Sequence, residues 1–187
     1  MGLPILVIGA GICGVSSALW LQRSGHRVIL IDKTAPGMGA SFGNAGLLAQ
    51  WAVTPVTTPD LWQALPKYAL NPASPLFIKW QYIPKLAPWL WKFLQQANDS
   101  SAKAASAALG PLLLDAVDQH KALSQGSSAE SWIADCQFCY AYRDHKAFQK
   151  DRYAWGLKQA AGLVPNVLSG PDVQDAEPAL GPAIQCL

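Results

Sequence analysis

The sequence is poor in charge, and it lacks the patterns of several common classes of protein. Only 14% of its 187 residues are charged, the net charge is +2, and no basic block stands out, so a nucleic-acid partner has no support. No apolar run reaches the roughly 18 uncharged residues that a membrane-spanning helix needs. H-E-x-x-H, G-x-S-x-G and P-loop motifs are also missing, which argues against metalloprotease, serine hydrolase and P-loop chemistry.

Cysteine and histidine are scarce and form no complete metal-ligand pattern. Cys136 and Cys139 have the spacing of a zinc or redox pair, but no second pair follows at a suitable distance, and their neighbours are typical of a strand. We interpret these cysteines as ordinary thiols of a reducing compartment, and we expect no metal site. We expect surface positions for the scattered histidines, and we assign no catalytic acid or base; the histidines are His26, His120 and His145.

Apolar residues are abundant, and they begin with a recognisable pattern. They make up 51% of the chain, which implies a sizeable buried core. The sequence predicts strands over residues 4–9 and 27–31, with a helix over residues 12–24 that Gly25 caps. Strand, helix and strand within about 30 residues form a βαβ unit. We therefore predict an α/β fold of the Rossmann type.

Three glycines stand where the first strand meets the helix. Gly9 allows a tight turn, Gly11 allows a diphosphate to approach, and Gly14 lets the helix pack closely on the sheet. Free N–H groups and the positive end of the helix dipole would then hold the anion. Asp32, at the end of the second strand, is placed to accept a hydrogen bond from a ribose hydroxyl, and an acid there argues against a 2′-phosphate. This combination predicts a dinucleotide site.

The remainder of the chain is expected to be mostly helical. Pro84 and Pro88 should break residues 76–96 into short helices. Four further elements are expected: a helix or helix pair over 101–125 interrupted at 110–111, a strand over 137–142, a helix over 146–161 and a short strand over 163–168.

A second glycine-rich loop identifies a family. The segment "GMGASFGNAG", residues 37–46, resembles the second motif of the D-amino acid oxidase-like FAD-dependent oxidoreductase family. Within that family, "SFGNAGLLAQWAVTP", "KWQYIPKLAPWLWKFL", "YAYRDHKAFQKD" and "VLSGPDVQDAEPAL" resemble bacterial D-amino acid dehydrogenases. The specific motifs lie in the first 60 residues, and the resemblance extends over nearly the whole chain.

The resemblance implies a two-domain flavoenzyme. Residues 1–75 would form the first segment of the FAD-binding domain, residues 76–150 part of an α+β substrate domain, and residues 151–187 an incomplete return to the FAD-binding domain. Members of the family are much longer, and their C-terminal half carries a second flavin motif and the cation that binds the substrate carboxylate. We therefore expect a truncated chain, which is either the N-terminal part of a longer protein or one piece of a split protein whose C-terminal half is on another chain.

The resemblance also assigns residues to the cofactor, FAD. Asn44 has an ordinary alternative role as a turn residue in the left-handed region, which asparagine tolerates. The expected contacts are Gly9, Ala10, Gly11, Ile12, Cys13 and Gly14 with the diphosphate, Asp32 and Lys33 with the adenosine ribose, and Ser41, Asn44, Ala45 and Gly46 near the flavin.

The implied reaction is oxidation of a D-amino acid to an imino acid and then a keto acid and ammonia, with hydride transfer to flavin. Two alternatives stay open: an oxidase of glycine, sarcosine or a proline derivative, and a non-catalytic truncated nucleotide-binding module. The Trp-rich, lysine-bearing residues 76–96 suit either a membrane surface, where a dehydrogenase could reach a quinone, or substrate-domain helices packed on the core or on the missing half of the protein. The expected location is the cytoplasm, with peripheral attachment to the inner membrane as the second possibility.

Overall fold

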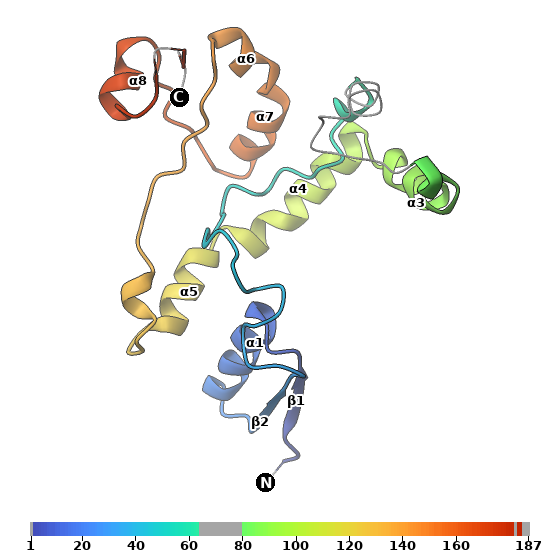
Figure 1. Cartoon of the computed structure of the whole chain (residues 1–187), viewed down its shortest axis with the longest axis vertical. Coiled ribbons are helices and arrows are strands. Elements are labelled where there is room, and N and C mark those ends of the chain that lie inside the picture. The colour runs from blue at the N-terminus through green and yellow to red at the C-terminus, as the bar shows by residue number, and fades with distance from the viewer. Residues whose placement is uncertain (1, 64–79, 182, 185–187) are drawn as a thin grey trace. The chain divides into compact units, whose positions relative to one another are not determined.

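The computed structural model describes residues 2–63, 80–181 and 183–184 (Figure 1). The residues group into two compact units. The first comprises Met1–Ala49 and Asp115–Asp135, and the second comprises Gln50–Leu114 and Cys136–Leu187. The predicted domain boundaries after residues 75 and 150 stay a prediction. In the part of the chain that the structure describes, no helix is long and apolar enough to cross a membrane.

The first unit contains the predicted βαβ arrangement. Strand β1 (Ile5–Ile8) and strand β2 (Val28–Ile31) are parallel neighbours, with Ile5 opposite Val28, and helix α1 (Ile12–Arg23) connects them. Gly25 has φ +85°, and the amide of His26 donates to the Leu21 carbonyl at 3.1 Å. This is the hydrogen bond of a Schellman cap, so the predicted role of Gly25 at the end of the helix is confirmed.

The two faces of this sheet differ in how well they are covered. On one face, Val7 packs against helix α1. A Cβ added to Gly14 of that helix would lie 3.7 Å from Cγ1 of Val7, which shows how close the two are. The other face consists of aliphatic side chains that the described residues leave about half exposed or more. Their exposed fractions are 53% for Leu6, 79% for Ile8, 48% for Ile29 and 44% for Ile31. Parallel sheets are normally covered on both faces, so this face is left without its usual packing.

The first unit also contains helix α5 (Ala116–Ser124) and the 3-10 helix η2 (Glu130–Trp132). The guanidinium of Arg23, at the end of α1, donates to the carbonyl oxygens of Ala122 at 2.7 Å and Leu123 at 3.1 Å. The last carbonyls of a helix lack partners within the helix, so this arginine both caps α5 and joins it to α1.

The second unit is helical, and its prolines do not act as expected. Helix α3 (Ile83–Gln95) continues through Pro88, and helix α4 (Asp99–Leu113) continues through Pro111. The prediction of breaks at these prolines was wrong, because a proline removes a backbone hydrogen bond without ending a helix whose other turns stay bonded. Pro84 is in the first turn of α3, where its missing N–H has no helical partner to lose. The chain between α4 and α5 turns at residues 114–115 instead of 110–111.

The remaining elements are η1 (Trp80–Tyr82), α6 (His145–Lys150), α7 (Arg152–Ala160) and α8 (Pro171–Ala176). The helix predicted over 146–161 is therefore two helices, which meet at Asp151. The predicted strands over 137–142 and 163–168 are not formed: residues 137–141 and 163–168 are in no strand, and only isolated bridge residues occur, at Tyr142 and at Ser169. Aromatic side chains explain the strand-like composition of the first segment, because they pack against one another.

That packing forms the core of the second unit, which we call the aromatic cluster: Trp51, Tyr140, Tyr142, Phe148, Trp155 and Lys158. Trp155 is only 6% exposed, and its ring meets that of Tyr140 edge to face at 5.0 Å between centroids. Lys158 is 4% exposed, with its ammonium 3.8 Å from the Tyr140 ring centre and 4.1 Å from that of Trp155. The rings thus provide the cation with a favourable electrostatic environment.

Candidate functional site

The glycine turn (residues 9–14) has the conformation that the sequence predicts. Gly9 has φ +102°, a region that residues with a Cβ rarely adopt. Its amide donates to the Ile31 carbonyl at 2.8 Å, which continues the strand pairing into the turn. A Cβ on Gly14 would lie 1.7 Å from the Gly9 carbonyl oxygen, so only glycine allows the helix to approach the strand this closely. The turn therefore depends on both glycines.

Helix α1 begins directly after Gly11, which provides no side-chain cap. Its first amide, that of Ile12, donates instead to the Ser41 hydroxyl at 2.9 Å. The amides of Cys13 and Gly14 follow in the first turn, where backbone donors have no carbonyl acceptor within the helix. No acidic residue lies in that turn, so the positive end of the helix dipole is not compensated there. These features suit the binding of an anion.

Asp32 faces the glycine turn. Its Oδ2 accepts the Ala10 amide at 2.7 Å, and its Oδ1 accepts the Thr34 amide at 3.0 Å and the Thr34 hydroxyl at 3.2 Å. The Ala10 amide, followed by that of Thr34, lowers the pKa of the carboxyl below its ordinary value. A carboxylate has about four acceptor positions, so Asp32 keeps capacity for a sugar hydroxyl. It is exposed, and a ligand can therefore reach it.

The second loop (residues 37–46) is bonded to the glycine turn and to itself. The Gly37 amide donates to the Ala10 carbonyl at 2.8 Å. The Asn44 side chain donates to the Ser41 carbonyl at 2.6 Å and accepts the Gly46 amide at 2.7 Å. No described non-glycine residue has a positive φ, so Asn44 is not in the left-handed region that the alternative required. It holds the loop through its side chain.

The structure thus brings together most of the predicted site. Ala10, Ile12, Asp32 and Ser41 are joined by direct hydrogen bonds. Lys33 and Ala45 are exposed, and no side-chain hydrogen bond connects either to the turn within the described residues. Sequence reasoning missed Thr34, which orients Asp32. The Asp-x-Thr spacing could have indicated it, because an aspartate often accepts the amide two residues later.

The site fits a dinucleotide. A Cβ added to Gly11 would lie 3.2 Å from the Ser41 hydroxyl oxygen. Apart from the residues next to Gly11 and the backbone of its own helix, no other atom lies within 4 Å of that Cβ. The side of the turn at Gly11 is therefore open to a ligand, apart from one hydroxyl. The turn offers backbone donors to a diphosphate, and Asp32 offers acceptors to a ribose. Donors and acceptors are thus arranged as FAD would require at its adenosine end.

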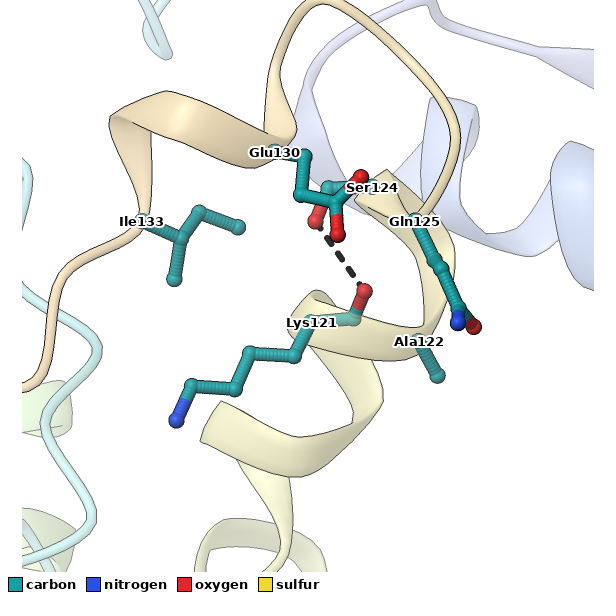
Figure 2. Close-up of a pocket in the computed structure, with 6 residues that line it drawn as sticks. All are labelled: Lys121, Ala122, Ser124, Gln125, Glu130 and Ile133. Atoms are coloured by element: carbon teal, nitrogen blue, oxygen red, sulfur yellow. Dashed lines mark hydrogen bonds between the residues drawn. The ribbon is translucent and has the colours of Figure 1, made fainter.

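A cavity of about 400 Å³ in the first unit lies between α5 and η2 (Figure 2). The Ser124 hydroxyl donates to the Lys121 carbonyl at 3.0 Å, and the Glu130 carboxylate accepts the Gly126 amide at 2.8 Å. The Lys121 ammonium binds Asp135 at 2.6 Å. The charged groups around this cavity are already paired, and none belongs to the glycine turn. Its lining consists of Lys121, Ala122, Ser124, Gln125, Glu130 and Ile133.

A cavity of about 510 Å³ in the second unit is lined partly by rings of the aromatic cluster, and also by Cys136, Cys139 and residues 164–168. Among the described residues no group of three His, Cys, Asp or Glu side chains could hold a metal ion. His120 has its Nδ1 2.9 Å from the Ala116 carbonyl of its own helix, and His145 has its Nε2 2.9 Å from the Gln149 amide nitrogen. Both contacts are local to one helix, and neither histidine joins the glycine turn.

Comparisons with known proteins agree with this geometry. The sequence model of the family described as "FAD dependent oxidoreductase" (DAO) matches residues 4–186. The chain is 35% identical to a D-amino-acid oxidase of Bradyrhizobium diazoefficiens over 97% of its own length and 44% of that protein. It is 31% identical to D-amino acid dehydrogenase 2 of Ralstonia nicotianae, over 97% of its length and 43% of that protein.

The chain is also 31% identical to a D-amino acid dehydrogenase of Helicobacter pylori, over 78% of the chain and 35% of that dehydrogenase. The chain therefore spans less than half the length of these relatives. No solved structure matches the chain.

Proposed function

The chain belongs to the FAD-dependent oxidoreductase family, and from that premise we propose that it binds FAD at the glycine turn and takes part in oxidising a D-amino acid. One observation carries the cofactor part of the proposal. The Asp32 carboxylate accepts the Ala10 amide at 2.7 Å, which puts an acid for the ribose beside the amides for the diphosphate. Asp32 supports the turn through this bond and keeps acceptor capacity for a ribose hydroxyl.

The proposed contacts follow the order of the chain. Residues 9–14 surround the diphosphate, and the amides of Cys13 and Gly14 in the first turn of α1 donate to it. Asp32 and Lys33 lie at the adenosine ribose. Ser41, Asn44, Ala45 and Gly46 lie near the flavin. The bonded network of Ser41, Asn44 and Gly46 supports this assignment, because a loop held by its own hydrogen bonds can position a cofactor without reorganising.

Bound FAD supplies the acceptor for a hydride that leaves the Cα of the amino acid. Loss of the hydride would leave an imino acid, which water would hydrolyse to a keto acid and ammonia. The residues of this chain hold the cofactor in place for that transfer. The D-amino acid is supported by the names of the relatives, which are oxidases and dehydrogenases of D-amino acids. We propose a quinone as the final electron acceptor and the cytoplasm as the location, with attachment to the inner membrane.

We further propose that the site is completed by a C-terminal half that the relatives carry and this chain does not match. The chain spans 44% of the Bradyrhizobium oxidase. The uncovered sheet face of Leu6, Ile8, Ile29 and Ile31 supports the proposal, because such a face normally packs against further elements of its domain. The second unit would then provide part of an α+β substrate domain.

The proposal is tested by titrating the purified chain with FAD and following the quenching of flavin fluorescence. We expect saturable binding that weakens on the order of ten-fold or more in Asp32→Ala, because a ligand hydrogen bond and the support of the turn are both lost. Asp118→Ala, which removes an exposed aspartate of α5, is the matched control and should bind nearly as well as the wild type. Absence of FAD binding in the wild type contradicts the proposal and favours the non-catalytic module.

Activity is tested by mixing the FAD-loaded chain with the unmatched C-terminal part of the Bradyrhizobium oxidase under anaerobic conditions. Bleaching of the flavin absorbance by D-alanine supports the proposed reaction. Bleaching by glycine, sarcosine or proline but not by D-alanine favours the alternative oxidases. Binding of FAD without bleaching by any of these amines contradicts the catalytic part of the proposal alone.

A further inference from the structure

Both carboxylate oxygens of Asp32 already accept hydrogen bonds from the protein itself. Oδ2 accepts the Ala10 amide at 2.7 Å, and Oδ1 accepts the amide and the hydroxyl of Thr34 at 3.0 and 3.2 Å. A carboxylate offers about four acceptor positions, two on each oxygen. The described residues therefore fill both positions of Oδ1 and one position of Oδ2, and the free acceptor position lies on Oδ2.

Thr34 is the residue that fills Oδ1. Its amide and its hydroxyl both donate to that oxygen, in the turn that an aspartate commonly forms with the residue two positions later. The amide belongs to the backbone, so most other residues at this position would keep that bond. The hydroxyl belongs to the side chain. The residue type at position 34 therefore decides whether Oδ1 has an acceptor position to offer a ligand.

The number of free acceptor positions matters because an adenosine ribose carries two neighbouring hydroxyl groups, at C2′ and C3′. A carboxylate with a free position on each oxygen can accept a pair of donors at once, as it does with the paired N–H groups of arginine. Asp32 has a free position on Oδ2 only, so it can accept one hydroxyl. Asp32 and Thr34 are both exposed, and the second hydroxyl can therefore stay hydrated.

From this geometry we propose that Thr34 is a positioning residue that restricts Asp32 to a single hydroxyl of the adenosine ribose. The inference rests on the proposed function, because it concerns the FAD site at the glycine turn. It adds to that function a specificity within the sugar. One ribose hydroxyl is required for full affinity, and the other contributes little, because removing it takes away bonds to water alone.

The experiment uses FAD and two FAD analogues, one lacking the 2′-hydroxyl and the other the 3′-hydroxyl of the adenosine ribose. Each is titrated into the full chain while flavin fluorescence is followed. With the wild type, one analogue should bind on the order of ten-fold more weakly than FAD, because a hydrogen bond to a charged acceptor is lost. The other should bind within about two-fold of FAD, because its missing hydroxyl has no protein acceptor.

Two variants test the role of Thr34 itself. Thr34→Val removes the hydroxyl and keeps the branched shape of the side chain, so Oδ1 gains a free acceptor position. Both analogues should then bind more weakly than FAD, each by about three- to ten-fold, because both ribose hydroxyls now have an acceptor. Thr34→Ser keeps a hydroxyl and is the matched control. In this variant one analogue alone should lose affinity, as in the wild type.

The ratio of analogue to FAD affinity separates positioning from a merely structural role. If Thr34 only stabilised the loop, Thr34→Val would weaken FAD and both analogues by the same factor, and their ratios would not change. Each ratio compares ligands on one protein sample, so a partly unfolded variant does not alter it. The wild-type titrations test the single-hydroxyl part of the inference without any variant.

Three results would overturn the inference. The first is a similar loss of affinity for both analogues in the wild type, and the second is a loss for neither. The third is a Thr34→Val variant that still loses affinity for one analogue alone. A wild type that binds no FAD would contradict the proposed function as well, whereas FAD binding with any of these three patterns would contradict the inference alone.

Discussion

The glycine turn is held together by backbone contacts, whereas the aromatic cluster is held together by side-chain contacts. In the turn, contacts are made by the backbone, and a Cβ at Gly14 would be 1.7 Å from another residue's carbonyl oxygen. In the cluster, contacts are made by large side chains, and Trp155 is enclosed by the rings of Trp51, Tyr140 and Phe148. The turn has little side-chain packing of its own, whereas the cluster has a well-covered centre.

The difference shows how stability and binding are distributed in this chain. The turn keeps backbone donors and the Asp32 carboxylate accessible, as a cofactor site requires, and the sheet below it has an uncovered apolar face. The polar atoms of the cluster bond to one another and to a neighbouring carboxylate. Trp155 Nε1 donates to the Tyr142 hydroxyl at 3.0 Å, and that hydroxyl donates to the Asp151 carboxylate at 2.7 Å. We therefore expect mutations in the cluster to affect mainly folding and those in the turn to affect both folding and FAD binding.

Removing the central ring of the cluster should have the largest effect on stability. Trp155→Ala deletes a side chain that is 6% exposed and leaves a cavity, which should cost about 3–5 kcal/mol of unfolding free energy. Urea unfolding monitored by far-UV circular dichroism measures this loss. Trp132→Ala, at an 86% exposed position, should change stability by less than about 0.5 kcal/mol. Equal losses in the two variants would show that the cluster is not the core.

Gly14→Ala should have the next largest effect. Its Cβ would overlap the Gly9 carbonyl, so the turn must shift, at a cost of about 1–3 kcal/mol. FAD titration should also show a loss of binding, because the amides of the turn move. Gly39→Ala is the matched control in the second loop, since an added Cβ there meets nothing within 4 Å. A Gly14→Ala variant that binds FAD normally would contradict the close approach of helix and strand.

Low pH should weaken the turn selectively. The Ala10 amide is the main cause of the lowered pKa of Asp32, whose ordinary value is 3.8. The native state thus favours the carboxylate, so this stabilisation is present above pH 3.8 and is lost as the pH falls through the lower native pKa. Hydrogen exchange of the Ala10 amide over an acid series measures the effect. Asp32→Asn should remove the dependence, and an unchanged acid response in that variant would exclude Asp32 as its source.

High pH should weaken the cluster instead. Burial is the main cause that raises the pKa of Tyr142 from 10.0 to about 12, and the hydrogen bond to Asp151 adds to it. The native state therefore favours the neutral phenol, and this stabilisation is present below pH 10.0 and is lost as the pH rises toward about 12. The pKa of Tyr153 is also raised, mainly by burial, but Tyr142 is the tyrosine raised to about 12. Phenolate absorbance should therefore show a last component near pH 12, which Tyr142→Phe should remove. Late titration that persists in Tyr142→Phe would assign it to another tyrosine.

The sequence was sufficient for the glycine turn and insufficient for the cluster, and the reason lies in the range of the contacts. The βαβ unit follows from neighbouring residues: apolar runs, glycine spacing and the cap at Gly25. The role of Ser41 as the cap of α1 joins residues 29 positions apart, and a local pattern cannot specify such a pairing. The Asp32 carboxylate was expected to face the turn, and it does, but its bond to the Ala10 amide could not be predicted from spacing alone.

The wrong predictions have a common origin in the second unit. Residues 137–142 have the composition of a strand, yet a strand needs a partner, and composition does not say whether one is present. There the aromatic residues pack on Trp155 and Phe148 as side chains of an extended segment. Similarly, Pro88 and Pro111 indicate a local cost to the helix, whereas the outcome depends on the hydrogen bonds of the remaining turns. In both cases the result depends on interactions that residue composition alone does not specify.

A glycine in the second unit provides the smallest test of the comparison. Gly156 is within helix α7, and a Cβ added there meets nothing within 4 Å, so Gly156→Ala should stabilise the chain by about 0.5–1 kcal/mol through helix propensity. Gly162, just after the same helix, has φ +87°, and Gly162→Ala should destabilise by about 1–2 kcal/mol. Urea midpoints of the two variants should shift in opposite directions. If Gly156→Ala destabilised the chain as Gly14→Ala does, glycine would be required for close packing in both units, and the contrast between a backbone-built turn and a side-chain-built cluster would fail.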